Sequence, residues 1–236
     1  MLAAMGLAPA LQAQTASFNG TVALSSQLFD RGQAITGHTP VLQGAAFWTF
    51  PAGWSLGVSG SVEARSPGHL AETLVQASRD WSLSGDWQVQ ANLLYYTYDT
   101  KGDAAPFDRT EAGLHWTYRD VLTFGLSASH VSGAAGRPRA AADLGVHWPL
   151  ARHLYLSAGV GVAESAPGAG RHHRYDATDG YYRVRTSLHR YGHAGLLWSK
   201  GPWQIELDRI VADAAMRRQW RNADADPWVA TISRSF

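Results

Sequence analysis

The chain has 236 residues, of which 45% are hydrophobic and 17% are charged, and its formal net charge is +1. A charge this close to zero argues against nucleic acid as a main partner, because phosphate binding normally requires a clustered surplus of basic residues. The absence of cysteine excludes disulfide bonds and every zinc or iron–sulfur site that depends on cysteine ligands.

The first 13 residues resemble the second half of a secretory signal peptide. They contain an apolar core, a helix-breaking Pro9 and small residues that lead to a plausible cleavage site after Ala13. The basic segment that opens such a signal is missing, so the alternatives are a start codon placed too late and a simple apolar arm. We interpret residues 1–13 as a signal-peptide remnant and residues 14–236 as a single domain.

From residue 18 onward the sequence alternates with a period of two. In residues 154–162 every second residue is Leu, Ala or Val, and those between are Tyr, Ser or Gly. This period predicts β-strands, whose successive side chains point to opposite faces. No apolar run is long enough for a transmembrane helix, and no segment of similar length shows helical spacing with caps. The predicted strands are residues 18–29, 40–50, 54–64, 70–81, 87–99, 109–119, 121–132, 138–148, 153–164, 184–199, 202–213 and 226–236.

The connections between these strands alternate between short and long. Short links follow every second strand, whereas connections such as 30–39, 165–183 and 214–225 are longer and rich in Gly, Pro, Asp and Arg. Outer-membrane barrels show this asymmetry, with tight periplasmic turns and longer outer loops. The sequence therefore predicts an all-β fold: an antiparallel up-and-down transmembrane β-barrel of about twelve strands in a Gram-negative outer membrane.

Aromatic residues accompany the short turns. Together with Phe50, Tyr118, Tyr155 and Phe236, the tryptophans near these turns are expected to form a girdle at one membrane interface. The alternative is a soluble β-sandwich with core tryptophans, but such a fold does not place Trp beside every second turn. The tryptophans are Trp54, Trp81, Trp87, Trp116, Trp148, Trp198 and Trp203.

The C-terminal segment has the pattern of a last barrel strand. Trp228, Ala230, Ile232 and Phe236 share one face, and the chain ends on an aromatic residue. This resembles the signal that the barrel-assembly machinery of Gram-negative bacteria reads, so Phe236 is the expected assembly signal. Arg234 departs from that pattern, which usually has an apolar or aromatic residue there.

Two short motifs lie in the first predicted hairpin. Phe29-Asp30-Arg31-Gly32 precedes a segment in which Pro40 is followed by Gln43 and Gly44. They resemble the aromatic-Arg-Gly and Pro-x-x-Gln-Gly elements of the TorF-like family of outer-membrane porins, although Asp30 departs from the first element. The resemblance covers about thirty residues and implies a barrel with a passive pore whose substrate is poorly defined.

The positions of these motif residues suggest their roles. Arg31 and Gly32 are expected at an outer-loop turn, and Gln43 and Gly44 on opposite faces of the returning strand. A structural role is expected, because glycine permits a tight turn and arginine can bond loop carbonyls. The alternative is a role in gating or ligand capture.

One face of each strand is assigned to lipid and the other to the lumen, where polar residues are expected. The expected function is a narrow porin for passive diffusion of small polar solutes or ions. The alternative is a barrel plugged by the same side chains, with a structural or surface-contact role. The candidate pore-lining residues are Glu63, Glu72, Arg109, Glu111, His115, Asp143, His147, Glu206 and Asp208, with Gln27, Gln43, Gln76, Gln88, Gln90, Asn92 and Arg119 in the same set.

His130 and Ser132 raise the possibility of an enzyme. A His-x-Ser on a strand resembles the site of outer-membrane lipid A deacylases, and residues two apart share a face, as a base and a nucleophile require. Those enzymes are smaller barrels, and the nearest acid, Asp143, falls on the lumen face. We therefore expect no enzymatic activity.

No cofactor is indicated. Residues 171–174 read Arg-His-His-Arg without a carboxylate at ligand spacing, so a basic loop that faces solvent or lipopolysaccharide is expected there, not a metal site. No phosphate-binding or cofactor motif occurs. The expected partners are outer-membrane lipids, lipopolysaccharide, the barrel-assembly machinery during insertion, and small polar solutes or ions.

Overall fold

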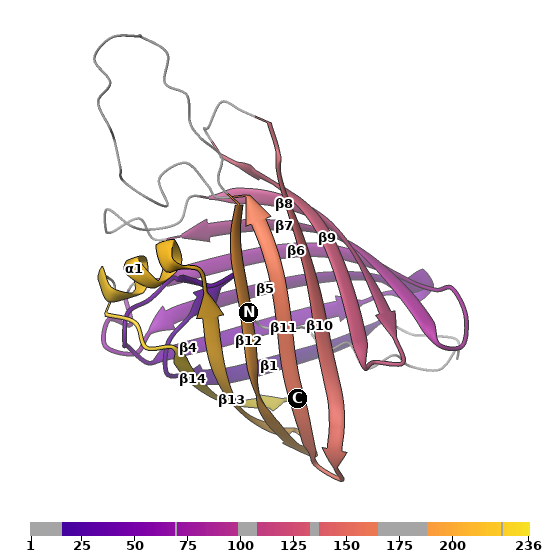
Figure 1. Ribbon diagram of the computed structural model, residues 1–236. Helices are drawn as coiled ribbons and strands as arrows, with labels where there is room; N and C mark the ends of the chain where they lie inside the picture. Colours follow the sequence, from indigo (N-terminus) through magenta and orange to yellow (C-terminus); the bar gives the residue numbers. More distant parts are fainter. Residues whose placement is uncertain (1–15, 69, 99–107, 133–136, 165–187, 223) are drawn as a thin grey trace.

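Twelve strands close into one antiparallel barrel, which confirms the predicted architecture (Figure 1). The computed structural model describes residues 16–68, 70–98, 108–132, 137–164, 188–222 and 224–236. Each barrel strand pairs with the next in sequence, and β1 pairs with β14 to close the sheet. The barrel strands are β1 (Ser17–Ser25), β4 (Val41–Thr49), β5 (Trp54–Glu63), β6 (Leu70–Ser82), β7 (Trp87–Tyr98), β8 (Arg109–Tyr118), β9 (Leu122–Val131), β10 (Arg139–Ala151), β11 (Leu154–Glu164), β12 (Leu188–Lys200), β13 (Trp203–Ala212) and β14 (Trp228–Ser235).

Tight turns join the strands at the inner end of the barrel, as the sequence predicts. The link between β4 and β5 contains the 3₁₀ turn η1 (Pro51–Gly53). Gly53 has φ of +79°, and a side chain there would collide with the carbonyl oxygen of Asp80 on β6. Only glycine fits this turn.

The outward positions of the strands are apolar and exposed. On β13, Ile205, Leu207 and Val211 are each about half exposed, while Glu206 and Asp208 between them are less exposed. The closed ladder satisfies the backbone polar groups without help from water, which a bilayer requires. The closed barrel and its apolar exterior place the chain in a bacterial outer membrane.

Aromatic side chains gather on the outside near the inner turns. Trp54, Trp81, Trp87, Trp148, Trp198 and Trp203 are all exposed. The rings of Trp87 and Tyr118 are 5.0 Å apart. The prediction that Tyr155 belongs to this girdle is wrong, because its ring stacks on His147 at 4.6 Å on the interior face of the sheet.

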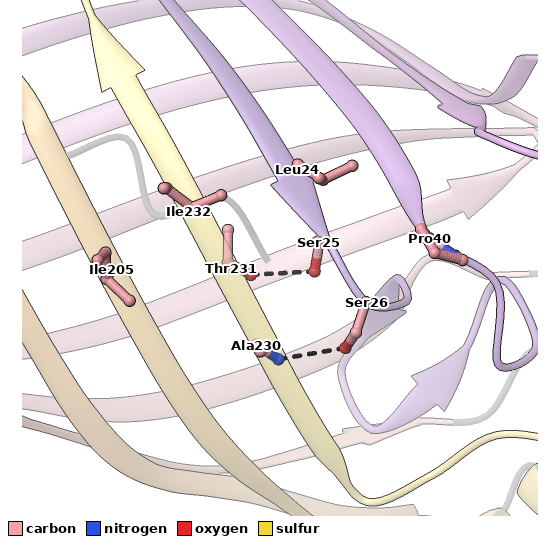
Figure 2. Close-up of a pocket in the computed structure, with 8 residues that line it drawn as sticks. All are labelled: Leu24, Ser25, Ser26, Pro40, Ile205, Ala230, Thr231 and Ile232. Carbon is pink, nitrogen blue, oxygen red and sulfur yellow. Dashed lines mark hydrogen bonds between the residues drawn. The ribbon is translucent and has the colours of Figure 1, made fainter.

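Strand β1 ends at Ser25, so the prediction of a strand through Phe29 is wrong. The N–H of Ser26 donates to the carbonyl oxygen of Ala230 at 2.9 Å, and the Ser26 hydroxyl accepts from the N–H of Ala230 at 3.2 Å (Figure 2). Beyond this pair, β14 has no β1 residue beside it.

The side chain of Gln27 replaces the missing strand. Gln27 is 1% exposed, and its amide nitrogen donates to the carbonyl oxygens of Asp226 and Trp228. Its amide oxygen accepts from the N–H of Asp226 at 3.1 Å. These bonds satisfy the β14 backbone at the seam.

Two small elements lie at the outer end of the barrel, in segments predicted as loops except for Phe29, the last residue of the first predicted strand. The short strands β2 (Phe29–Asp30) and β3 (Gln33–Ala34) form a hairpin, and helix α1 (Ala214–Asn222) follows β13. Asp213 caps α1, because its carboxylate accepts from the N–H groups of Ala215 and Met216 at 3.1 Å. In the part of the chain that the structure describes, no helix is long and apolar enough to cross a membrane.

The hairpin and α1 share a small hydrophobic core. Phe29, Ala34 and Trp220 are buried together, and the Phe29 and Trp220 rings meet edge to face at 5.3 Å. Side chains of β13 and β14 pack against this cluster, including Ile210 and Val229. The core fixes the hairpin and the helix to the barrel.

The last strand has the facing that the sequence predicts, with Trp228, Ala230 and Ile232 exposed on the outside. Phe236 pairs with Gly20 through two backbone hydrogen bonds of 3.0 Å. The guanidinium of Arg234 lies 5.5 Å from the ring centroid of Trp203. This contact accommodates an arginine on the outward face, and the role of Phe236 in assembly stays a prediction.

Candidate functional site

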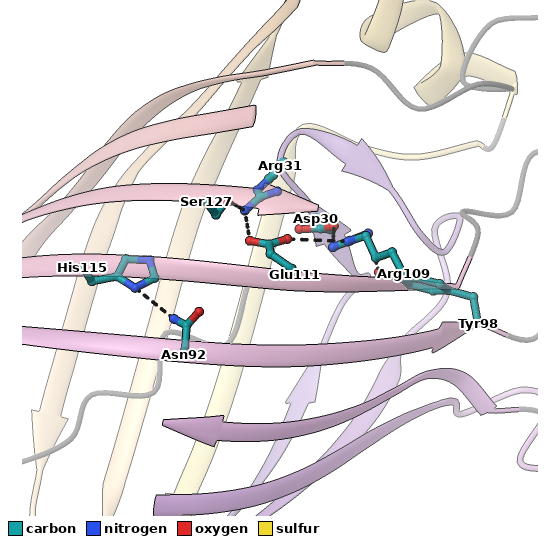
Figure 3. Close-up of polar contacts among 8 residues, drawn as sticks. All are labelled: Asp30, Arg31, Asn92, Tyr98, Arg109, Glu111, His115 and Ser127. Carbon is teal, nitrogen blue, oxygen red and sulfur yellow. Dashed lines mark hydrogen bonds and ion pairs between the residues drawn. The ribbon is translucent and has the colours of Figure 1, made fainter. Parts of the chain in front are cut away.

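The β2–β3 hairpin crosses the barrel interior and binds the opposite wall. β8 and β9 lie about halfway around the closed sheet from β1. The Arg31 guanidinium nevertheless forms an ion pair with Glu111 of β8 and donates to the hydroxyl of Ser127 of β9 at 2.9 Å (Figure 3). The sequence suggested that Arg31 bonds carbonyls of its own loop, but these partners lie across the lumen.

Arg109 of β8 makes a second ion pair with the hairpin. Its guanidinium lies 2.5 Å from the Asp30 carboxylate and donates to the Tyr98 hydroxyl at 2.9 Å (Figure 3). Its Nε is 3.7 Å from an oxygen of Glu111. The guanidinium carbon also lies 4.1 Å from the ring centroid of Tyr96. Charge pairing and ring stacking therefore hold Arg109 in place.

Two acidic and two basic side chains form this group of ion pairs, which we call the latch: Asp30, Arg31, Arg109 and Glu111. The side chain of Glu111 is 5% exposed and that of Asp30 is 20% exposed. Burial alone would raise the pKa of Asp30, but the guanidinium groups of Arg109 and Arg31 outweigh burial and lower that pKa. Removing one member of such a group leaves its partner charged and buried, which is costly.

Gly32 allows the hairpin that carries the latch to lie close to β12. It has φ of +76°, and a Cβ there would lie 2.7 Å from the Cβ of Tyr191 on β12. Its carbonyl oxygen accepts from the indole nitrogen of Trp220 at 2.7 Å. Both the turn and the close approach require glycine. The hairpin is thus fixed from several sides and narrows the outer half of the lumen.

The second sequence motif, formed by Pro40, Gln43 and Gly44, borders the β2–β3 hairpin. The carbonyl oxygen of Pro40 accepts from the N–H of Ala64 at 2.7 Å where β4 begins. Gln43 is 5% exposed on the inner face of the wall. Gly44 faces outward, and a Cβ there would touch nothing within 4 Å.

Deeper in the lumen, acidic side chains lie on β10 and β13. Asp143, Glu206 and Asp208 occupy inward positions of these strands. Gly125 pairs with Asp143, and Gly195 pairs with Asp208. A side chain at either glycine would collide with the carboxylate opposite. The glycines therefore give these carboxylates room beside the wall.

Histidines line the same region. His115 shares a hydrogen bond of 3.0 Å with Asn92 (Figure 3). His147 stacks on Tyr155, and the ring of His193 covers Gly159.

Carboxylates outnumber guanidinium groups on the inward positions of the described strands. The inward arginines, Arg109 and Arg139, lie at the outer ends of β8 and β10. Within the described strands, no Arg or Lys faces inward below them. A fixed negative charge in a narrow passage concentrates cations and repels anions. The inward carboxylates are those of Glu63, Glu72, Asp80, Glu111, Asp143, Glu206 and Asp208.

Other candidates from the sequence lie elsewhere. His130 and Ser132 are exposed on the outside of the wall, away from the inward Asp143. Arg119 is not in the lumen, because it forms an ion pair of 2.8 Å with Asp86 at an inner turn. Residues 1–13 and 171–174 lie outside the described residues. Among the residues that the structure places, no cluster of His, Asp or Glu could hold a metal ion.

Comparison with known proteins shows the barrel fold. No protein-family model and no curated protein matches the chain. The NanC porin structure matches with a TM-score of 0.54 at 12% identity, over 93% of this chain and 98% of that chain. The KdgM porin matches with a TM-score of 0.54 at 8% identity, over 92% of this chain and 98% of the KdgM chain. A KdgM structure in complex with disordered oligogalacturonate has a TM-score of 0.53 at 8% identity, over 94% and 98%.

Proposed function

We propose that the chain is a narrow outer-membrane porin for small polar solutes or ions, with a preference for cations. The observation that carries this proposal is the acidic lumen below the latch, where Asp143, Glu206 and Asp208 face inward without a neighbouring inward Arg or Lys on the described strands. The latched hairpin makes the passage narrow. The porin names of the NanC and KdgM structures agree with this function.

Conductance of the purified chain in planar lipid bilayers tests the proposal. We expect small, uniform conductance steps, because solutes must pass beside the hairpin. Swelling of liposomes that contain the protein, with neutral sugars of increasing size, measures the size limit. Folded protein that shows neither conductance nor swelling would contradict the proposal.

The second candidate is a plugged barrel with a structural or surface-contact role. The latch favours it, because two ion pairs hold the hairpin across the lumen. A barrel plugged by the hairpin is silent in bilayers while the latch is intact, whereas a porin with a narrow entrance conducts.

Three finer assignments accompany the proposal. Membership of the TorF-like family is supported by the Arg31–Gly32 turn and by the motif of Pro40, Gln43 and Gly44. Recognition of Phe236 by the assembly machinery is supported by its place at the end of β14. Contact with lipids and lipopolysaccharide is supported by the apolar exterior.

A further inference from the structure

The outside of the barrel has a hollow at the seam between β1 and β14. Its volume is about 290 Å³, and Leu24, Ile205, Ala230 and Ile232 line it, with Pro40 across the gap (Figure 2). The hollow forms because Ala230 is small and because β1 ends at Ser25.

The polar groups around the hollow are already satisfied. The hydroxyls of Ser25 and Thr231 share a hydrogen bond of 2.9 Å, and Ser26 is bonded to the backbone of Ala230 (Figure 2). The surface that remains is apolar, faces the membrane and lies at the end of β1 nearest the outer loops. An acyl chain is the chemistry that such a surface accepts.

An arginine lies next to this hollow on the lipid-facing surface. Leu207 pairs with Ala230, and Arg209 pairs with Trp228 one row further outward. Arg209 is exposed between the apolar Leu207 and Val211, and its guanidinium lies 5.8 Å from the ring centroid of Trp228. Among the described residues, no carboxylate lies within ion-pair distance of Arg209.

Helix α1 adds positive charge at the same end of the barrel. It contains Arg217, Arg218 and Arg221 and no acidic residue. These arginines are exposed, and the helical spacing places them on one side, whereas Met216 and Trp220 are buried. The carboxylate of Asp213, directly before the helix, caps its first turn, and Asp224 follows Arg221 by three residues.

We propose that the hollow and Arg209 form a binding site for a phosphorylated lipid of the outer leaflet, the lipid A part of lipopolysaccharide. An acyl chain occupies the hollow, and a phosphate group binds the guanidinium of Arg209, which matches a phosphate in charge and geometry. The arginines of α1 attract the second phosphate. The site depends on the membrane placement of the barrel and not on whether the lumen conducts.

Binding of lipid A to the refolded full chain in lipopolysaccharide-free detergent, measured by native mass spectrometry, tests the site. The probes are bisphosphorylated lipid A and the same lipid after phosphatase treatment. We expect Arg209→Gln to weaken binding of the phosphorylated lipid by about tenfold and to leave binding of the treated lipid unchanged. Ala230→Phe fills the hollow and should weaken binding of both, with Ala230→Leu as a milder form.

Arg79→Gln is the matched control. Arg79 also faces outward and stacks on tryptophans, Trp54 and Trp81, but it lies at the inner end of the barrel. Its replacement should leave lipid A binding unchanged, and unheated gels verify that each variant is folded. Equal binding by Arg209→Gln and the wild type would overturn the site. So would an equal loss in Arg79→Gln, or phosphatidylglycerol binding as tightly as lipid A.

Discussion

At the scale of residues, Arg31 links the hairpin to the far wall, and its loss should widen the passage. Arg31→Ala leaves Glu111 without its closest partner, and the lost charged hydrogen bond should weaken the closed position by about 1.5–3 kcal/mol. We expect larger and noisier single-channel conductance in planar bilayers. Arg119→Ala is the control, because its pair with Asp86 is exposed at an inner turn. Unchanged conductance in Arg31→Ala would show that the hairpin does not limit flow.

Asp30 determines how the latch responds to acid. Because the pKa of Asp30 lies below its ordinary value of about 3.9, its stabilising effect is complete above that value. The effect is lost only as the pH falls through the lowered pKa. The ratio of Asp30→Asn to wild-type conductance should therefore exceed one and stay constant from pH 7 to pH 5. A ratio that falls toward one in this range would mean that Asp30 is already protonated.

The sequence predicts which face a strand residue occupies, but not which residue it meets across the lumen. Alternation placed Glu111 and Arg109 correctly on the inward face of β8. Their partners, Arg31 and Asp30, lie about 80 residues away in a loop without a period. Tyr155 shows the complementary error, because proximity to a turn suggested an outward ring although its alternation with Ser157 places it inside.

At the scale of elements, α1 holds the hairpin in place through Trp220. Trp220→Ala removes the contact with Phe29 and the hydrogen bond to Gly32, and such a loss costs about 3–5 kcal/mol. We expect faster hydrogen exchange at the amide of Ile35, which bonds to Leu28 in the hairpin, with little change in barrel melting.

Trp203→Ala is the control for this element, because Trp203 is exposed on the outside at the inner end of the barrel. It should leave the exchange at Ile35 unchanged. If the amide of Ile35 exchanges equally slowly in Trp220→Ala and in the wild type, the latch alone fixes the hairpin.

The elements missed by sequence reasoning are those that depend on tertiary contacts. Helix α1 has nine residues, fewer than an isolated helix needs to be stable, so packing of Met216 and Trp220 decides its formation. The cap at Asp213 and the spacing of those two residues were the available signals. No signal in the sequence indicated that β1 ends early. Gln27 continues the alternating pattern of a strand, although in the structure its side chain, and not its backbone, bonds the neighbouring chain.

At the scale of the whole molecule, the barrel was predictable because closure is dictated by the membrane. The described strands alternate, apart from register irregularities between β5 and β6 and between β10 and β11. An apolar exterior requires that no sheet edge remain unpaired. The narrowing of the lumen was not predictable, since it arises from a loop that folds inward. The charge of the lumen follows from which residues of each strand face inward.

If the lumen conducts, it should favour cations over anions. The inward carboxylates lie in a passage with walls of low dielectric constant, which strengthens their field. Asp208→Asn should move the reversal potential, measured across a salt gradient, toward zero selectivity. Asp86→Asn, at an exposed inner turn, should not. An anion preference at neutral pH would mean that the outer arginines, and not the inner carboxylates, determine selectivity.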